Sequence, residues 1–313
     1  MGQYVVTVTL NPALDKTVVI DKFEVGGLNR VKNMRIDPGG KGINVARVLT
    51  GLGVAVQATG IIAGSQGQLL KQYLAAEKIS ESFVTIPGQT RTNLKVVDAN
   101  SKVTTEINEA GFLVGKVELE KFKEHLEQLL DNVCYLVLSG SLPPQAENSI
   151  YSELIGIAKG KGVHTVLDAD DAALRLGITA RPLAIKPNIH ELEKLVGRSL
   201  TDDNAVLCAV REIIDQGVEI VIVSMGAEGA LVVNKDEAYR VRVSSMIAES
   251  TVGAGDSMVA VLVYALLNKF SLSETARWVT AAGSATAAKP GTEVCNLSEI
   301  KQFLANVQVQ RQS

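Results

Sequence analysis

Cysteine is scarce in this 313-residue chain, and its three occurrences form no recognisable set. Cys134, Cys208 and Cys295 are odd in number, lie far apart and include no CxxC pair. Such spacing indicates neither a disulfide framework nor a zinc cluster. A reducing compartment such as the cytosol is therefore the simplest expectation.

The sequence also lacks an excess of basic charge and a long apolar run. Its formal net charge is −3, which gives no electrostatic reason to expect nucleic acid or an anionic membrane as a partner. The apolar stretch VAVLVYALL at 259–267 is too short to cross a bilayer, and the first residues show no signal-peptide pattern. We expect a soluble, unexported, cytoplasmic protein that binds any anion at a local site.

Two common phosphate-binding patterns are missing as well. The pattern GxxxxGK[ST] fails around Lys41, because Arg35 stands where its first glycine belongs and Gly42 follows the lysine. The pattern GxGxxG fails at Gly51 and at Gly253. These failures argue against a P-loop NTPase and against a Rossmann dehydrogenase.

What the chain does contain is an alternation of short β-branched runs with helical patterns. The runs have the composition of strands buried on both faces, and they occupy residues 3–10, 54–63, 133–140, 164–170, 182–188 and 219–226. Apolar residues recur with helical spacing at 117–133, 148–162 and 202–217. This alternation predicts an α/β fold with a mostly parallel sheet covered by helices.

Two regions depart from the alternation. Residues 16–37 and 90–109 alternate apolar and polar side chains around the turn signals GG and DANS, which is typical of hairpins in a half-exposed sheet. Such hairpins would form a lid over the crevice at the strand ends, where α/β folds bind ligands. Ordinary hairpins at the edge of the main sheet are the alternative.

The stretch STVGAGDSM at 250–258 combines two glycines and one acid with the start of an apolar segment. Its glycines let backbone N–H groups approach a ligand, and the helix that follows favours an anion at its N-terminus. Asp256 falls in the first turn of that helix, where the helix dipole stabilises a carboxylate. The stretch is either an anion hole with an acid beside it or a turn with a favourable helix-start residue.

Three other stretches lie at helix starts or in a hairpin. PGGKGINVAR, with Lys41 and Asn44, offers backbone N–H groups and a cation to a sugar or phosphate, or is a solvated glycine loop. In IKPNIHEL, Asn188 and Glu191 form a capping box or a pair that holds Mg²⁺ and phosphate. SMGAEGA at 224–230 predicts a hairpin whose loop can also pass beneath a nucleotide.

Asp15 belongs to TLNPALD, which follows the first predicted strand. We expect this residue at the end of that strand, on the carboxyl edge of the main sheet, where α/β folds bind ligands. The alternative is a turn aspartate that follows Asn-Pro.

Six stretches occur in a fixed order along the chain: TLNPALD, GGKGINVAR, LSGSLP, IKPNIHE, VSMGAEGA and STVGAGDS. Together they resemble the ribokinase-like sugar kinases of the phosphofructokinase B family, from residue 3 to about residue 290. The resemblance implies one kinase domain over residues 1–313, a three-layer α/β/α sandwich with a small β-sheet lid from about 16–37 and 90–109. It also implies transfer of a phosphoryl group from ATP, with Mg²⁺, to a sugar hydroxyl.

The resemblance also assigns roles to residues of these motifs. Asp256 would be the general base, and the backbone of Gly253, Ala254 and Gly255 would stabilise charge on the phosphoryl group. The other residues would contact the sugar substrate, the nucleotide or the metal. Substrate contacts would be Asp15, Arg30, Gly40, Lys41, Asn44, Arg91 and Ser141; nucleotide contacts Lys186, Asn188, Ser224, Gly226, Gly229 and Thr251; and metal contacts Glu191 and Asn188.

Within the family the chain is most similar to the branch of 1-phosphofructokinases and tagatose-6-phosphate kinases. VGGLNRV, GGKGINVAR and TRTNLKV carry this similarity and would place cations against a phosphorylated acceptor. Fructose 1-phosphate is the favoured acceptor, with tagatose 6-phosphate and fructose 6-phosphate as alternatives. A non-catalytic sugar-phosphate sensor is the alternative outside the enzymes.

Two further expectations follow from the same resemblance. Asp170 and Asp171 replace the small polar residues usual in this branch, which bears on metal handling and on the choice of acceptor. The exposed edges of a lid sheet favour pairing with a second chain, so we expect a homodimer formed through the lid.

Overall fold

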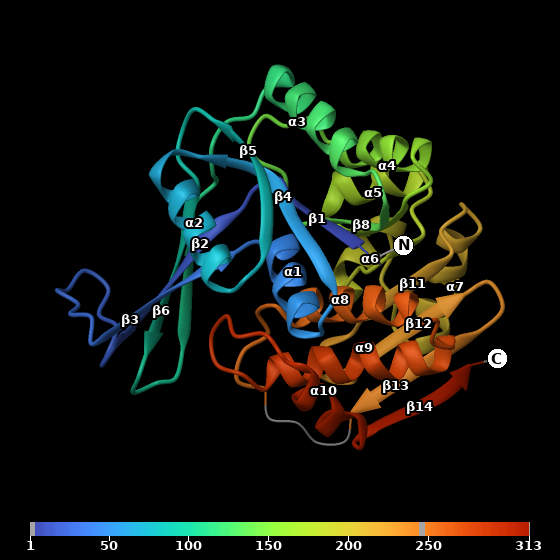
Figure 1. The fold of residues 1–313 in the computed structure, drawn as a ribbon. Coiled ribbons are helices and arrows are strands. Elements are labelled where there is room, and N and C mark those ends of the chain that lie inside the picture. Colours follow the sequence, from blue (N-terminus) through green and yellow to red (C-terminus); the bar gives the residue numbers. More distant parts are fainter. Residues whose placement is uncertain (1–3, 244–247, 313) are drawn as a thin grey trace.

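The computed structural model describes residues 4–243 and 248–312, and the strands of these residues form two separate sheets (Figure 1). The larger sheet has ten strands in the order β14, β13, β12, β11, β10, β9, β8, β1, β4, β5. The strands from β11 to β5 in this order pair parallel, whereas β12, β13 and β14 pair antiparallel at one edge. The predicted mostly parallel sheet is therefore confirmed.

The strands of the larger sheet follow the buried runs of the sequence. They are β1 (Tyr4–Thr9), β4 (Ala55–Ala63), β5 (Ser80–Ile86), β8 (Val133–Ser139), β9 (His164–Asp168), β10 (Ala184–Ile185), β11 (Ile220–Ser224), β12 (Ala230–Asn234), β13 (Ala238–Val243) and β14 (Val307–Gln312). Strand β10 is shorter than the run predicted at 182–188, because Pro182 and Pro187 cannot donate a backbone hydrogen bond. Residue 3, where the first predicted strand begins, lies outside the described residues.

Helices cover both faces of the larger sheet, so the main body has three layers (Figure 1). Side chains alternate between the two faces, as in strands buried on both sides: Val5 belongs to one apolar core and Val6 to the other. One face packs against α1 (Lys41–Gly51), α2 (Gly64–Ala76), α8 (Ala254–Leu267), α9 (Leu272–Ala287) and α10 (Leu297–Leu304). The other face packs against α3 (Lys116–Leu129), α4 (Ile150–Gly160), α5 (Asp171–Thr179), α6 (Ile189–Val196) and α7 (Asp203–Ile214). No described helix is long and apolar enough to cross a membrane.

The smaller sheet, which we call the lid, projects from the main body (Figure 1). Its strands, in order, are β3 (Asn33–Gly39), β2 (Ala13–Ile20), β6 (Arg91–Asp98) and β7 (Thr104–Asn108). Strand β2 pairs antiparallel with β3 and parallel with β6. The two regions that depart from the strand and helix alternation thus form a separate sheet and not edge hairpins of the main one.

Asp15 lies inside the lid, so the prediction that it ends the first strand is wrong. Strand β1 ends at Thr9, and Asp15 is the third residue of β2. Pro12 lies between the two strands and has no N–H group to continue the ladder of the main sheet. The chain therefore crosses to the lid before it reaches Asp15.

Candidate active site

A cavity of about 1160 Å³ lies between the lid and the carboxyl ends of the parallel strands. Every residue to which the family resemblance assigns a role lines this cavity, with the exception of Arg30. These residues span positions 15 to 256 of the sequence, and only the fold brings them together. The cavity is therefore the candidate active site.

Arg30 lies in the loop between β2 and β3, where its side chain is exposed. Its neighbours Leu28 and Val31 are 76% and 53% exposed. A motif match assigns a cation to this loop but does not determine the direction in which the loop turns. Arg30 is thus not among the described residues that line the cavity.

Asp256 lies in the first turn of α8, as predicted, and its side chain is only 6% exposed. Asn44 in α1 donates a hydrogen bond of 2.7 Å from Nδ2 to Asp256 Oδ2. Gly253 precedes α8 with a φ of 76°, a left-handed conformation that favours glycine. A Cβ atom at Gly255 would lie 3.0 Å from Lys186 Nζ, so glycine leaves room for this lysine close to the helix start.

The surroundings of Asp256 make it a stronger base than an exposed aspartate. Burial raises the pKa of Asp256 to about 6, and the nearby charge of Asp168 adds to this rise. The hydrogen bond from Asn44 and the charges of Lys41 and Lys186 oppose it. A carboxyl group with this pKa is mostly ionised at neutral pH and is well matched to accept a proton.

Two lysines converge on Asp168, which ends strand β9 and is buried. Lys41 Nζ lies 3.4 Å and Lys186 Nζ 3.6 Å from Asp168 Oδ1, and Lys41 Nζ also lies 3.0 Å from Asp170 Oδ1. Burial raises the pKa of Asp168, but Lys186 and Lys41 together lower it below its usual range. Asp168 Oδ2 is buried without a hydrogen-bond partner, which leaves this oxygen for a ligand in the cavity.

Asp168 was not among the residues predicted from the sequence. A signal was available, because the residue ends a buried run, and the carboxyl ends of parallel strands meet at the ligand-binding edge of such sheets. Of the two unusual aspartates that follow it, Asp170 lines the cavity, whereas Asp171 pairs with Lys194 at 3.2 Å on the surface.

On the lid, Arg91, Asn93 and Lys95 alternate along β6 and therefore share one face. Asn93 Nδ2 donates a hydrogen bond of 2.9 Å to Asp15 Oδ1, and Lys95 Nζ lies 3.3 Å from Asp15 Oδ2. All four side chains line the cavity. Asn93 and Lys95 were missed, although the period of two in TRTNLKV places them beside Arg91.

Asn188 and Glu191 form the predicted capping box at the start of α6. Asn188 Oδ1 accepts a hydrogen bond of 2.9 Å from the Glu191 N–H group, and Glu191 Oε2 accepts one of 2.8 Å from the Asn188 N–H group. Burial raises the pKa of Glu191. Among the described residues, no group of three or more His, Cys, Asp and Glu side chains is arranged to hold a metal ion.

The predicted hairpin in SMGAEGA is confirmed, since β11 and β12 pair antiparallel around a 3₁₀ turn, η1 (Gly226–Glu228). Ser224, Gly226 and Gly229 line the cavity from this hairpin. Thr251 lines it from the segment that precedes α8, and Ser141 from the segment that follows β8. The nucleotide contacts predicted from the sequence therefore lie on one connected surface with the helix start at Asp256.

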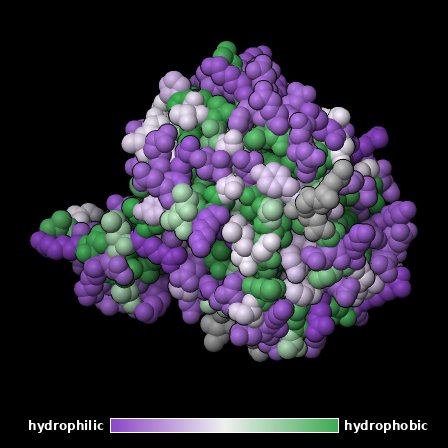
Figure 2. Space-filling model, in the orientation of Figure 1, coloured by the Kyte–Doolittle hydropathy of each residue, from purple (hydrophilic) through white to green (hydrophobic). Residues whose placement is uncertain are grey.

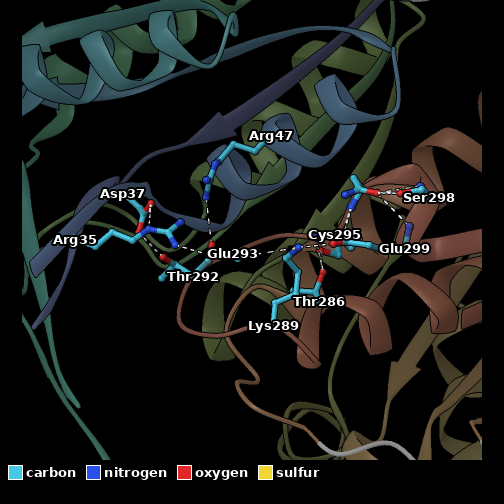
Figure 3. Close-up of polar contacts among 12 residues, drawn as sticks. Arg35, Asp37, Arg47, Thr286, Lys289, Thr292, Glu293, Cys295, Ser298 and Glu299 are labelled. Carbon is cyan, nitrogen blue, oxygen red and sulfur yellow. Dashed lines mark hydrogen bonds and ion pairs between the residues drawn. The ribbon is translucent and has the colours of Figure 1, made fainter. Parts of the chain in front are cut away.

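A polar junction fastens the lid to the main body (Figure 3). Thr292 Oγ1 donates a hydrogen bond of 2.7 Å to Asp37 Oδ2, and both side chains are buried. Arg35 Nη1 donates one of 2.6 Å to Glu293 Oε1, while Arg47 Nη1 donates one of 3.3 Å to the Thr292 carbonyl oxygen. The segment between α9 and α10 thus connects lid strand β3 with α1, whose first turn lines the cavity.

Comparison with known proteins decides the family. Residues 8–299 match the pfkB family of carbohydrate kinases. The chain belongs to this family. As a pfkB-family kinase it is a phosphotransferase, and the matched residues include both the lid and the helix start at Asp256.

Similar proteins cover nearly the whole of this pfkB-family chain. A 1-phosphofructokinase from Xanthomonas campestris pv. campestris is 38% identical over 286 residues, which is 90% of each chain. A 1-phosphofructokinase from Rhodobacter capsulatus is 39% identical over 278 residues, 88% of each chain. The crystal structure of phosphofructokinase-2 from Escherichia coli in complex with potassium has a TM-score of 0.91 and 32% identity, and covers 97% of this chain and 99% of that one. The predicted family and fold are thus confirmed.

Proposed function

We propose that this pfkB-family kinase transfers the γ-phosphoryl group of ATP to fructose 1-phosphate, which gives fructose 1,6-bisphosphate and ADP. The observation that carries the proposal is that buried Asp256, at the start of α8, lines the same cavity as the lid cations Arg91 and Lys95. A phosphorylated acceptor requires such cations. The two relatives described as 1-phosphofructokinases support fructose 1-phosphate as the acceptor.

Asp256 accepts the proton of the acceptor hydroxyl as its oxygen attacks the γ-phosphorus atom, and the bond between that phosphorus and the ADP oxygen breaks. The N–H groups of the Gly253–Gly255 segment stabilise the charge that develops on the transferred group. Asp15 and Asn44 bind and orient the sugar hydroxyls, which turns binding energy into alignment. Each step thus uses a residue that lines the cavity.

The oxygen atoms on the body side of the cavity fit Mg²⁺ bound together with the nucleotide. This ion commonly keeps water ligands and is held through one or two carboxylates and the substrate phosphates. Asp168 Oδ2 has no hydrogen-bond partner, and one Glu191 oxygen takes no part in the capping box. We assign these two oxygens to Mg²⁺, which neutralises phosphate charge when bound. Nucleotide contacts are assigned to Lys186, Asn188, Ser224, Gly226, Gly229 and Thr251.

The acceptor is tested by an ADP-release assay with fructose 1-phosphate, tagatose 6-phosphate and fructose 6-phosphate. We expect the highest kcat/KM for fructose 1-phosphate, by about tenfold or more, because pocket contacts discriminate by differential transition-state binding. A higher value for either alternative would overturn the choice of acceptor and leave the kinase assignment standing. If no sugar phosphate is phosphorylated but each raises the melting temperature, the protein is a sensor.

We also propose that two copies of the chain pair through the lid. The core of the lid is small, with Val18, Ile20 and Val96 as its buried members. Figure 2 shows hydrophobic residues exposed on the projecting part of the molecule. Apolar side chains at least half exposed on the lid and its loops are Val25, Leu28, Val31, Met34, Val103 and Ile107. An exposed apolar surface of this kind marks an interaction site, and a second copy is the partner always present.

The double substitution V25E/L28E should therefore convert a dimer into a monomer, because it places two carboxylates in an apolar contact. Analytical ultracentrifugation should show about half the mass of the wild-type protein. Val117 on α3 offers a matched control, since it is 62% exposed but lies on the main body. V117E should remain dimeric, and a monomeric wild-type protein would refute lid pairing. Arg30, which lies between Leu28 and Val31, would then lie at the contact.

The chain is further proposed to be one cytoplasmic kinase domain over residues 1–313. Strands near both ends of the described chain, β1 and β14, belong to the same ten-stranded sheet, which supports one folding unit. Residues 1–3, 244–247 and 313 lie outside the described residues. The scattered cysteines support a reducing compartment, since Cys134, Cys208 and Cys295 are all free thiols in the structure.

A further inference from the structure

Arg240 on β13 is the largest fully buried side chain of the described residues, and the residue is only 2% exposed. It does not line the active-site cavity. A buried guanidinium is costly unless each of its donors is paired, so its partners indicate what it holds in place.

The partners of Arg240 lie on four elements of the fold, one of which is its own strand. Arg240 Nε lies 3.0 Å from both carboxylate oxygens of Asp203, the first residue of α7. Arg240 Nη1 donates to the carbonyl oxygens of Glu228, Ala230 and Val241, at 2.7, 3.2 and 3.1 Å. The guanidinium therefore joins α7, the turn η1 and the start of β12 to its own strand, β13.

The turn that Arg240 holds faces the cavity on its other side. Gly226, Ala227 and Gly229 line the cavity, whereas the carbonyl of Glu228, between them, points to Arg240. The backbone of Gly229 has a φ of 89°, and a Cβ atom there would lie 2.0 Å from the Val241 carbonyl oxygen. The turn therefore packs against β13, and the Glu228 carbonyl oxygen accepts a hydrogen bond from the guanidinium in this orientation.

We propose that Arg240 is a positioning residue for nucleotide binding, which acts through the Gly226–Gly229 turn without touching the nucleotide. This inference rests on the proposed function, in which Ser224, Gly226 and Gly229 contact ATP. A turn with two glycines has high backbone freedom, and its ordering would otherwise be a cost of binding. Because Arg240 orders the turn in the folded protein before ATP binds, that loss of backbone freedom does not reduce the affinity for ATP.

The test compares the KM for ATP with the KM for fructose 1-phosphate in the Arg240→Met variant. Methionine keeps an unbranched side chain, shorter than that of arginine, and removes every donor. We expect the KM for ATP to rise about tenfold or more, with the KM for fructose 1-phosphate within about twofold of wild type. Arg240→Lys keeps the charge, so its KM for ATP should lie between the values for wild type and Arg240→Met.

Arg242 provides the matched control. It lies on the same strand and contacts the same carboxylate, with Nη2 at 3.1 Å from Asp203 Oδ2, but it is exposed and makes no bond to the turn. Arg242→Gln should leave both KM values within about twofold of wild type. An unchanged KM for ATP in Arg240→Met, or an equal rise in both KM values, would overturn the inference.

Two further results distinguish a variant that does not fold from a wrong positioning role, and a wrong positioning role from a wrong proposed function. If Arg240→Met does not fold, the ratio of the two KM values in Arg240→Lys decides the question in the same way. A wild-type protein that does not use ATP would refute the proposed function itself. A wild-type protein that uses ATP, with unchanged Arg240 variants, would refute only the positioning role.

Discussion

Replacing Asp256 with Asn is expected to lower kcat by about 10³-fold, the typical contribution of a positioned general base. Asparagine has nearly the same shape but cannot accept a proton from the acceptor hydroxyl. The KM values for ATP and fructose 1-phosphate should stay within about threefold of wild type, because the role proposed for Asp256 is in the transition state. Steady-state kinetics at saturating ATP measure both quantities.

The pH dependence of the wild-type enzyme gives an independent measurement on the same group. Asp256 must be ionised to act as a base, and burial raises its pKa to about 6 in the folded protein. The value of kcat/KM for fructose 1-phosphate should therefore fall as the pH is lowered through about 6. An Asp256→Asn variant with substantial activity and an unchanged acid limb would remove Asp256 from the role of base.

Stability measurements show whether the Asn variant is correctly folded. A carboxyl group whose pKa rises on folding stabilises the protein below its unfolded pKa, and this stabilisation is lost as the pH rises through the folded pKa. At about pH 8 the Asp256→Asn variant should therefore be more stable than wild type by about 3 kcal/mol, from a rise of roughly two pKa units. At about pH 4 the difference should nearly vanish, because wild-type Asp256 is then protonated when folded.

Replacing Arg91 with Ala should raise the KM for fructose 1-phosphate by about 10²-fold, because the proposed charge-assisted contact to the acceptor phosphate is lost. The structure shows how the guanidinium is held. Arg91 Nε and Nη2 donate to the Asn11 carbonyl oxygen at 3.2 and 3.0 Å, and Nη1 donates to the Glu109 carbonyl oxygen at 3.2 Å. Burial lowers the pKa of Arg91, which the charges of Asp15 and Glu109 oppose. The cation is thus anchored where the lid meets the main body.

Three comparisons make the Arg91 result specific to the acceptor phosphate. The KM for ATP should change by less than about threefold, because ATP is assigned to the other side of the cavity. Arg91→Lys keeps the charge but loses the fork of donors, so its KM should lie between those of wild type and Arg91→Ala. Lys16 is the control, because it is a lid cation that does not line the cavity. Lys16→Ala should have the same KM for fructose 1-phosphate as wild type. An unchanged KM in Arg91→Ala would contradict the phosphate contact.

The alternation of buried runs and helical patterns was sufficient to predict the α/β class. Strand burial and helix amphipathicity both produce patterns among residues that are close together in the sequence. The start of α8 at Asp256 and the capping box of Asn188 and Glu191 are local for the same reason, since each involves one turn of helix. The prediction for strand β10 was too long, because it followed the apolar composition of the run. The two prolines in that run cannot donate backbone hydrogen bonds, and they limit the strand to two residues.

The candidate site was only partly visible in the sequence. Ordered motifs pointed to Asp256, Lys41 and Arg91, which line the cavity. They carry no information on how a loop turns, and Arg30 does not line the cavity. Asp15 was placed on the wrong sheet, since the crossing of the chain after β1 depends on which strands pair in space.

The sequence by itself determined the alternation of strands and helices in the main body, the two regions that form the lid and the position of the acid at a helix start. These properties arise from interactions within a few residues of each other along the chain. Only the tertiary structure decided that Asp168 lies between two lysines, that Lys95 contacts Asp15 and that buried Arg240 holds the cavity-lining turn. Burial and charge act through space, so a pKa, an ion pair or a buried donor is set by residues that the chain separates and the fold brings together.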